Sequence, residues 1–309
     1  MEGKSSKLNE VFSKIIENTK PNEVSFLISD CVMDLGERTN LTEGSTMKGE
    51  IYQALTKNKE LAALCYMYTS DFNGDYYYNQ LNDKPFLGMV MNHRPFYIWV
   101  LGSPSNLSFL TQQVSQGGKR LFDGYDQVYS FGIEGISVTS HFLSYPKKGK
   151  VSLADSGKLV RIRETPSSFS LGFNASSSII PLLGKDLNAS LFTVEPDYLG
   201  ISTEINYDDS LKNDRYYSYI AQTVSDYKLD VILTFNFEKE IRKLEKDITV
   251  KISKPSLNWV RTVSLDNDEG LTYEELEGKT FSFNYITEAF DRRYGEETLV
   301  NIVLEVENK

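Results

Sequence analysis

The chain has 309 residues, of which 40% are hydrophobic, 12% aromatic and 25% charged. This composition excludes disorder over most of the length and any collagen-like or low-complexity architecture. Thirty-three Lys and Arg residues against 43 Asp and Glu residues give a formal net charge of −10, which argues against a general affinity for nucleic acid or anionic membranes, because both depend on a positive surface.

Cysteine usage and hydropathy both indicate a cytoplasmic protein. Only two cysteines occur, Cys31 and Cys65, and both lie in apolar runs, as buried thiols of a reduced compartment do. No segment reaches the ~18 to 20 apolar residues of a membrane-spanning helix. The N-terminus passes into an amphipathic pattern without the apolar core of a signal peptide. We therefore expect a cytoplasmic protein of bacterial type that contacts neither membrane nor nucleic acid.

At about 150 residues per domain the length indicates two domains, and the first of them, residues 1–120, is predicted to be a three-layer α/β domain. Helical spacing of apolar residues alternates there with short apolar runs rich in β-formers. Such runs are typical of strands covered on both faces, as in a parallel sheet. We expect residues 24–28, 61–68 and 96–101 to form adjacent parallel strands. The expected helices span residues 8–18, 46–57 and 107–114.

After residue 125 the apolar period changes from about 3.6 to 2, and turn residues separate the runs at intervals suited to hairpins. The sequence therefore predicts one or two antiparallel β-sandwiches over residues 126–309. Two charged stretches, 238–247 and 287–295, fit either short helices or charged hairpins. The expected strands cover residues 128–131, 136–143, 159–162, 169–173, 187–192, 217–224, 230–237, 248–252, 280–285 and 299–306.

The strand that ends in Ser29-Asp30 places a carboxylate at the carboxyl edge of the predicted sheet, where open α/β sheets bind ligands. With the layout of helices and strands around it, this stretch resembles part of a von Willebrand factor A-type domain. The resemblance implies a Mg²⁺ site, for which Asp30, Asp34 and Asp71 are the candidate ligands. The family's Asp-x-Ser-x-Ser motif occurs nowhere in the chain, so we expect Mg²⁺ to bind no tighter than millimolar. In the alternative interpretation, Asp30 and Asp34 cap a turn.

Residues 69–95 are predicted to be a long loop between two strands, and loops of this length are usually functional or disordered. Tyr and Arg concentrate at protein interfaces, so the loop is a candidate recognition surface. Its alternative role is a loop folded back on the sheet with its tyrosines packed inside. The candidate partner-binding residues are Phe72, Tyr76, Tyr77, Tyr78, His93 and Arg94.

The sequence favours a non-enzymatic protein that binds a protein partner within a cytoplasmic assembly. No phosphate-binding glycine motif, zinc motif or Cys-x-x-Cys pair is present, and two histidines do not complete a hydrolytic triad. No cofactor is expected beyond the Mg²⁺ already discussed. Two alternatives stay open: a metal-dependent hydrolase using the same three carboxylates, and a structural subunit of an injection or defence particle.

Overall fold

In the computed structural model the chain forms two compact units, one of residues 1–133, 182–185 and 256–297, the other of 134–181, 186–255 and 298–309. This division differs from the predicted boundary near residue 120, because 256–297 belongs to the first unit. None of the helices in the described part is long and apolar enough to cross a membrane. The described residues are 7–32, 40–76, 86–113, 119, 121–134, 136, 138–154, 159–162, 166–175, 189–195, 201–207, 212–213, 217–237, 247–268, 270–295 and 298–308.

The first unit is built on a four-stranded antiparallel sheet of order β1-β3-β2-β4. Its strands are β1 (Val24–Ser29), β2 (Ala62–Tyr76), β3 (Phe86–Gly102) and β4 (Gln127–Phe131). The three predicted strands exist and are neighbours in one sheet, as predicted, but the prediction that they are parallel is wrong. Strand β3 lies between β1 and β2 and runs antiparallel to both.

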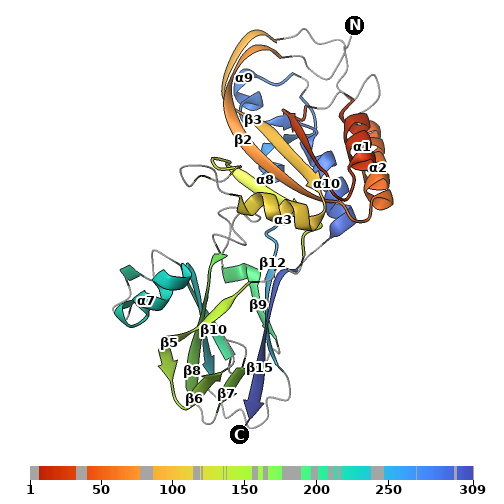
Figure 1. Cartoon of the computed structure of the whole chain (residues 1–309). Helices are drawn as coiled ribbons and strands as arrows, with labels where there is room; N and C mark the ends of the chain where they lie inside the picture. Colours follow the sequence, from red (N-terminus) through yellow and green to blue (C-terminus); the bar gives the residue numbers. More distant parts are fainter. Residues whose placement is uncertain are drawn as a thin grey trace. The chain divides into compact units, whose positions relative to one another are not determined.

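The strands of this sheet have apolar runs because side chains pack on both faces of the sheet, although the sheet is antiparallel. Helices α1 (Leu8–Asn18), α2 (Asn40–Lys57) and α10 (Phe283–Tyr294) belong to this unit (Figure 1). They supply side chains to the core on one face of the sheet. On the other face Tyr66 stacks on Phe122, with 4.6 Å between ring centroids. Helix α3 (Pro104–Gln112) adds the buried side chain of Leu107.

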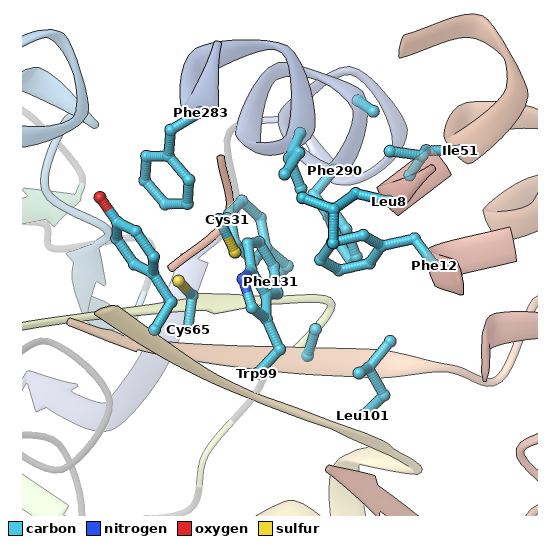
Figure 2. Close-up of a cluster of buried hydrophobic side chains, with 14 of the residues drawn as sticks. Leu8, Phe12, Cys31, Ile51, Cys65, Trp99, Leu101, Phe131, Phe283 and Phe290 are labelled. Atoms are coloured by element: carbon cyan, nitrogen blue, oxygen red, sulfur yellow. The ribbon is translucent and has the colours of Figure 1, made fainter. Parts of the chain in front are cut away.

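The core on the helical face is dense in aromatic side chains (Figure 2). Trp99 lies at its centre, edge-on to Phe12 with 5.2 Å between centroids and 4.8 Å from Phe290. Cys31 and Cys65 lie in the same core as free, buried thiols, as predicted. Phe12 comes from α1 and Phe290 from α10, so the core joins segments from both ends of the chain.

The C-terminal part of the first unit contains short elements beside α10. These are α8 (Asn258–Val263), β13 (Ser264–Leu265), α9 (Tyr273–Leu276) and β14 (Thr280–Phe281), with β13 and β14 paired in parallel. The predicted strand 280–285 is correct only for its first two residues. From Phe283 onward the chain is helical, because Phe283, Ile286 and Phe290 recur at helical spacing and are all buried.

The second unit contains two sheets. The first has the order β10-β11-β8-β5 and the second β6-β7-β15-β12-β9, and all their strand pairs are antiparallel except β7 with β15. Phe173 of β8 and Phe192 of β9, with ring centroids 6.4 Å apart, connect the two sheets. The strands are β5 (Ser140–Lys148), β6 (Val151–Ala154), β7 (Leu159–Ile162), β8 (Ser167–Phe173), β9 (Phe192–Glu195), β10 (Ile201–Tyr207), β11 (Val231–Phe237), β12 (Ile248–Ser253) and β15 (Thr298–Asn308).

One predicted strand of this unit is a helix. Residues predicted as strand 217–224 belong to α7 (Tyr217–Tyr227), which buries Ile220 and Val224, four residues apart, against the sheet. In the predicted strand 187–192, Ala189–Leu191 form a short 3₁₀ turn, η3, that leads into β9, and residues 187 and 188 lie outside the described residues. Most of the stretch 238–247 lies outside the described residues.

Candidate functional site

Residues predicted as a loop, 69–95, are largely the outer half of a long β-hairpin. Strand β2 continues to Tyr76 and β3 begins at Phe86. The register places Ser70 opposite Arg94 and Phe72 opposite Met91, so one extra residue of β3 is accommodated at Asn92-His93. His93 adopts a φ of 58° there, which is uncommon for a residue other than glycine. The hairpin therefore contains a β-bulge.

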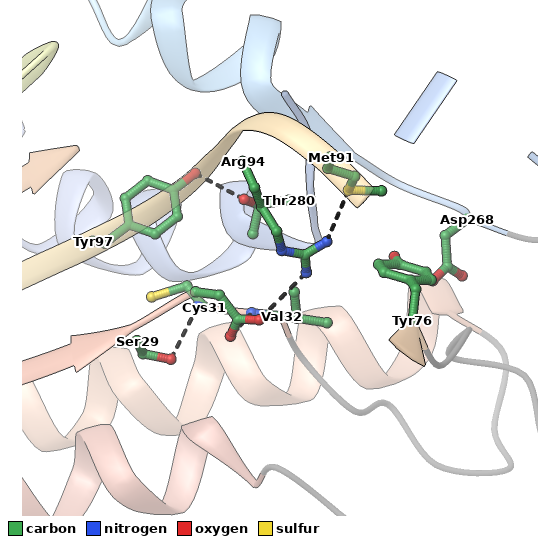
Figure 3. A network of polar contacts seen from close by, with 10 residues as sticks. Ser29, Cys31, Val32, Tyr76, Met91, Arg94, Tyr97, Asp268 and Thr280 are labelled. Carbon is green, nitrogen blue, oxygen red and sulfur yellow. Dashed lines mark hydrogen bonds and ion pairs between the residues drawn. The ribbon is translucent and has the colours of Figure 1, made fainter. Parts of the chain in front are cut away.

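The bulge gives the Arg94 side chain its direction. In a regular strand, residues three apart face opposite sides, yet an Arg94 Nη1–H points at Met91 Sδ at 3.5 Å. The guanidinium lies 4.8 Å from the ring centroid of Phe72 and 5.2 Å from that of Tyr76. Its Nη2 donates to Asp30 Oδ2 at 3.3 Å (Figure 3). Aromatic rings, a thioether and one carboxylate thus surround a buried cation.

Two tyrosine hydroxyls connect the hairpin to the segment that runs from β13 into β14. Tyr76 donates to Asp268 Oδ2 at 3.0 Å, and this carboxylate is buried. The hydroxyls of Tyr97 and Thr280 are 3.0 Å apart, and burial raises the pKa of Tyr97 well above its usual range. A small apolar cluster closes the same contact, formed by Tyr76, Met89, Met91 and Leu276 with Phe72, Leu265, Leu271 and Tyr273 packed against it.

This packing removes two residues from the recognition surface predicted for 69–95. Tyr76 and Arg94 are buried, and Phe72 is half-buried under the guanidinium. Only His93 is exposed among the described candidates. Tyr77 and Tyr78 lie outside the described residues. The part of the stretch that the structure describes therefore corresponds to the alternative interpretation, in which its aromatic residues pack inward.

The predicted metal ligands do not form a cluster in the described part of the chain. Asp30 is half-exposed and paired with Arg94, and its Oδ1 accepts from Val32 N at 3.4 Å, as a turn cap does. Asp71 is exposed opposite the bulge, and Asp34 lies outside the described residues. Over the residues described, no group of three or more His, Cys, Asp or Glu side chains could hold a metal ion.

Cys31 follows Asp30 and is not a reactive thiol. Its backbone N–H donates to Ser29 Oγ at 2.9 Å, and its φ is 54°. Burial raises the pKa of its thiol to about 12, so the thiolate, which is the nucleophilic form, is scarce at neutral pH. The hydrogen bonds of Ser29 and Asp30 and the ion pair of Asp30 with Arg94 hold a tight turn at the end of β1.

An accessible apolar surface lies on β1 itself, at the edge of the sheet. Phe26 is 48% exposed and Ile28 is 68% exposed. The opposite side of the strand is more polar: Leu27 packs on the core, while Ser25 Oγ lies 2.7 Å from Thr19 Oγ1. The apolar side of β1 belongs to the second face of the sheet, where Phe26 lies 6.2 Å from Phe122 between ring centroids. That face covers Phe26 and Ile28 only in part.

Sequence reasoning missed this surface, although a signal was present. Residues 24–29 alternate strictly, with Val24, Phe26 and Ile28 on one side and Ser25, Leu27 and Ser29 on the other. Leu27 lies between Phe26 and Ile28, so the stretch also fits a nearly continuous apolar run, and this hides the alternation. Comparison of the chain with protein-family models, with curated proteins and with solved structures gives no match.

Proposed function

We propose that this chain is a non-enzymatic protein–protein interaction module, and that strand β1 is its contact surface. The observation that carries the proposal is the incomplete cover of the apolar side chains Phe26 and Ile28 on β1. Fully burying a Phe or Ile side chain contributes about 1.5–3 kcal/mol, and both Phe26 and Ile28 retain about half or more of their exposure. A partner that covers them gains about half of that free energy at Phe26 and about two thirds of it at Ile28.

The rest of the first unit supports this function by holding β1 rigidly. Strand β1 pairs with β3 along its whole length, and Leu27 anchors it to the aromatic core. At its end, Asp30 is held by Arg94, which is itself enclosed by the bulged hairpin. A preorganised surface loses little conformational entropy on binding. Both cysteines are free and buried, which supports the cytoplasmic setting that the sequence suggests.

The test compares two lysine substitutions at equally exposed apolar residues. Ile28 on β1 and Leu87 on β3 are both 68% exposed, so Leu87→Lys is the matched control for Ile28→Lys. The tagged full chain is purified from the cells that produce it and weighed by native mass spectrometry. We expect wild type and Leu87→Lys to be found in a complex heavier than one chain, and Ile28→Lys to be found as single chains.

Two results would contradict the proposal. One is a wild-type chain that is isolated only as single chains at every concentration measured. The other is a complex that survives Ile28→Lys as well as it survives Leu87→Lys, because the contact surface would then lie elsewhere. Circular dichroism of each variant checks that the loss of the complex does not come from unfolding.

A further inference from the structure

We infer that the partner at β1 is a second copy of this chain, which adds its own β1 antiparallel across the sheet edge. The inference rests on the proposed function, because it names the partner of the same surface. Two four-stranded sheets would then join into one sheet through a twofold axis, a closed arrangement in which both copies use the same residues.

The sequence and pairing of strand β1 lack the usual devices by which edge strands avoid pairing. Edges are usually protected by charged side chains, prolines, bulges or very short strands. Residues 24–29 contain neither a charged residue nor a proline, and their pairing with β3 shows no register shift. Among the described residues, β1 has a strand neighbour on the β3 side alone. In the proposed dimer the second copy pairs with the other edge of β1.

The side-chain pattern of β1 is complementary to itself in one register. Directly opposed residues of an antiparallel pair lie on the same side of the sheet, so Phe26 must oppose an even-numbered residue of the other copy. With Leu27 opposite Leu27 of the other copy, Phe26 faces Ile28 and Ser25 faces Ser29. Moving one strand by two residues relative to the other places Ser25 opposite Leu27 instead. This register pairs a polar with an apolar side chain. The first register is therefore favoured.

Local charge also permits self-association, although the whole chain carries a net charge of −10. Two acidic residues flank β1, and each is paired with a cation of its own chain. Glu23 binds Lys20 at 3.2 Å, and Asp30 binds Arg94 at 3.3 Å. An antiparallel copy brings the Lys20–Glu23 end of one strand towards the Asp30–Arg94 end of the other. Neither end presents an unbalanced charge to its counterpart.

The first experiment measures the mass of the full chain against concentration by analytical ultracentrifugation. A six-residue strand pair is smaller than a standard protein interface, so we expect a dimer that dissociates in the micromolar range. Ile28→Lys is expected to weaken dimerisation at least tenfold, and Leu87→Lys to leave it within twofold of wild type. A chain that stays monomeric up to several hundred micromolar overturns the inference, as does a dimer that Ile28→Lys leaves intact.

The second experiment tests the register by oxidation of single cysteine variants. Opposed Cα atoms in an antiparallel pair are about 4.5–5.5 Å apart, within reach of a disulfide. Leu27→Cys is expected to give a disulfide-linked dimer. Ser25→Cys is not, because the two copies of residue 25 lie about 13 Å apart along the strands. Cys31 and Cys65 are buried and do not interfere. Equal cross-linking of both variants overturns the register.

The two proposals fail in different ways. If the chain is monomeric by ultracentrifugation but a different protein binds it in an Ile28-dependent manner, β1 is a contact surface and only the second copy is wrong. If neither a second copy nor another protein depends on Ile28, the proposed function itself is wrong.

Discussion

Replacing Tyr76 by Phe is expected to lower the free energy of unfolding of the first unit by about 2 kcal/mol. The substitution keeps the aromatic ring, and with it the contact to the Arg94 guanidinium at 5.2 Å. It removes the hydroxyl that donates to Asp268 Oδ2 at 3.0 Å. Asp268 is 1% exposed, so water does not replace the donor, and hydrogen bonds to charged groups contribute about 1.5–3 kcal/mol.

A matched control separates this hydrogen bond from the loss of any tyrosine hydroxyl in the same cluster. Tyr273 also packs against the cluster, and its hydroxyl donates to the neutral carbonyl of Val90 at an exposed position. Tyr273→Phe should therefore cost less than about 1 kcal/mol. Tyr76→Ala, which also removes the ring, should cost about 3–5 kcal/mol.

The assay is urea denaturation followed by tryptophan fluorescence. Both tryptophans of the chain, Trp99 and Trp259, belong to the first unit, so their emission reports the unfolding of that unit. If Tyr76→Phe destabilises no more than Tyr273→Phe does, the buried hydrogen bond to Asp268 is not a major source of stability. If Tyr76→Ala leaves the midpoint nearly unchanged, Tyr76 is a surface residue, as the sequence suggested, and its assigned packing is wrong.

Three further substitutions or reactions test the surroundings of Arg94. Asp30→Asn should cost less than about 1 kcal/mol in urea denaturation, because the carboxylate is half-exposed and its one contact with Arg94 is long. His93→Gly should raise the free energy of unfolding by about 0.5–1 kcal/mol, since glycine accepts the positive φ at the bulge. A lower free energy of unfolding would show that the imidazole makes a compensating contact. Cys31 and Cys65 should react with a thiol reagent at pH 8 only as fast as the unit unfolds, because burial raises the pKa of both thiols, and rapid labelling of folded protein would contradict their burial.

The sequence predicts the elements of the first unit better than their connections. Apolar runs correctly placed strands at 61–68 and 96–101, because burial on both faces requires apolar residues on both sides of a strand. Such burial does not depend on strand direction. Here Phe122 and α3 cover the second face of an antiparallel sheet, and no local pattern distinguishes this cover from the helices of a parallel sheet.

The hairpin beyond residue 69 was missed for a different reason. Its polar composition favours a loop, but the residues from Asp71 to Tyr76 alternate between polar and aromatic or small side chains, as a half-buried strand does. Exposed Asp71 and Asp75 keep one side in water while Tyr76 is buried. The site around Arg94 could not be predicted, since its partner Asp30 and the contact of Tyr76 with Asp268 join residues 64 and 192 positions apart.

The division of the chain between its two units has a consequence for synthesis on the ribosome. Helix α10, which closes the core around Trp99, is made after nearly all of the second unit, and β15, which lies between β7 and β12, follows it. Neither unit can therefore complete its core while the nascent chain is shorter than about residue 290. Until then the apolar surfaces of β2, β3 and β12 lack the cover of α10 and β15. Folding intermediates with such exposed apolar surface are prone to aggregate. Folding of this chain is thus expected to be completed after translation, with a need for chaperone protection that a chain of two sequential domains would not have.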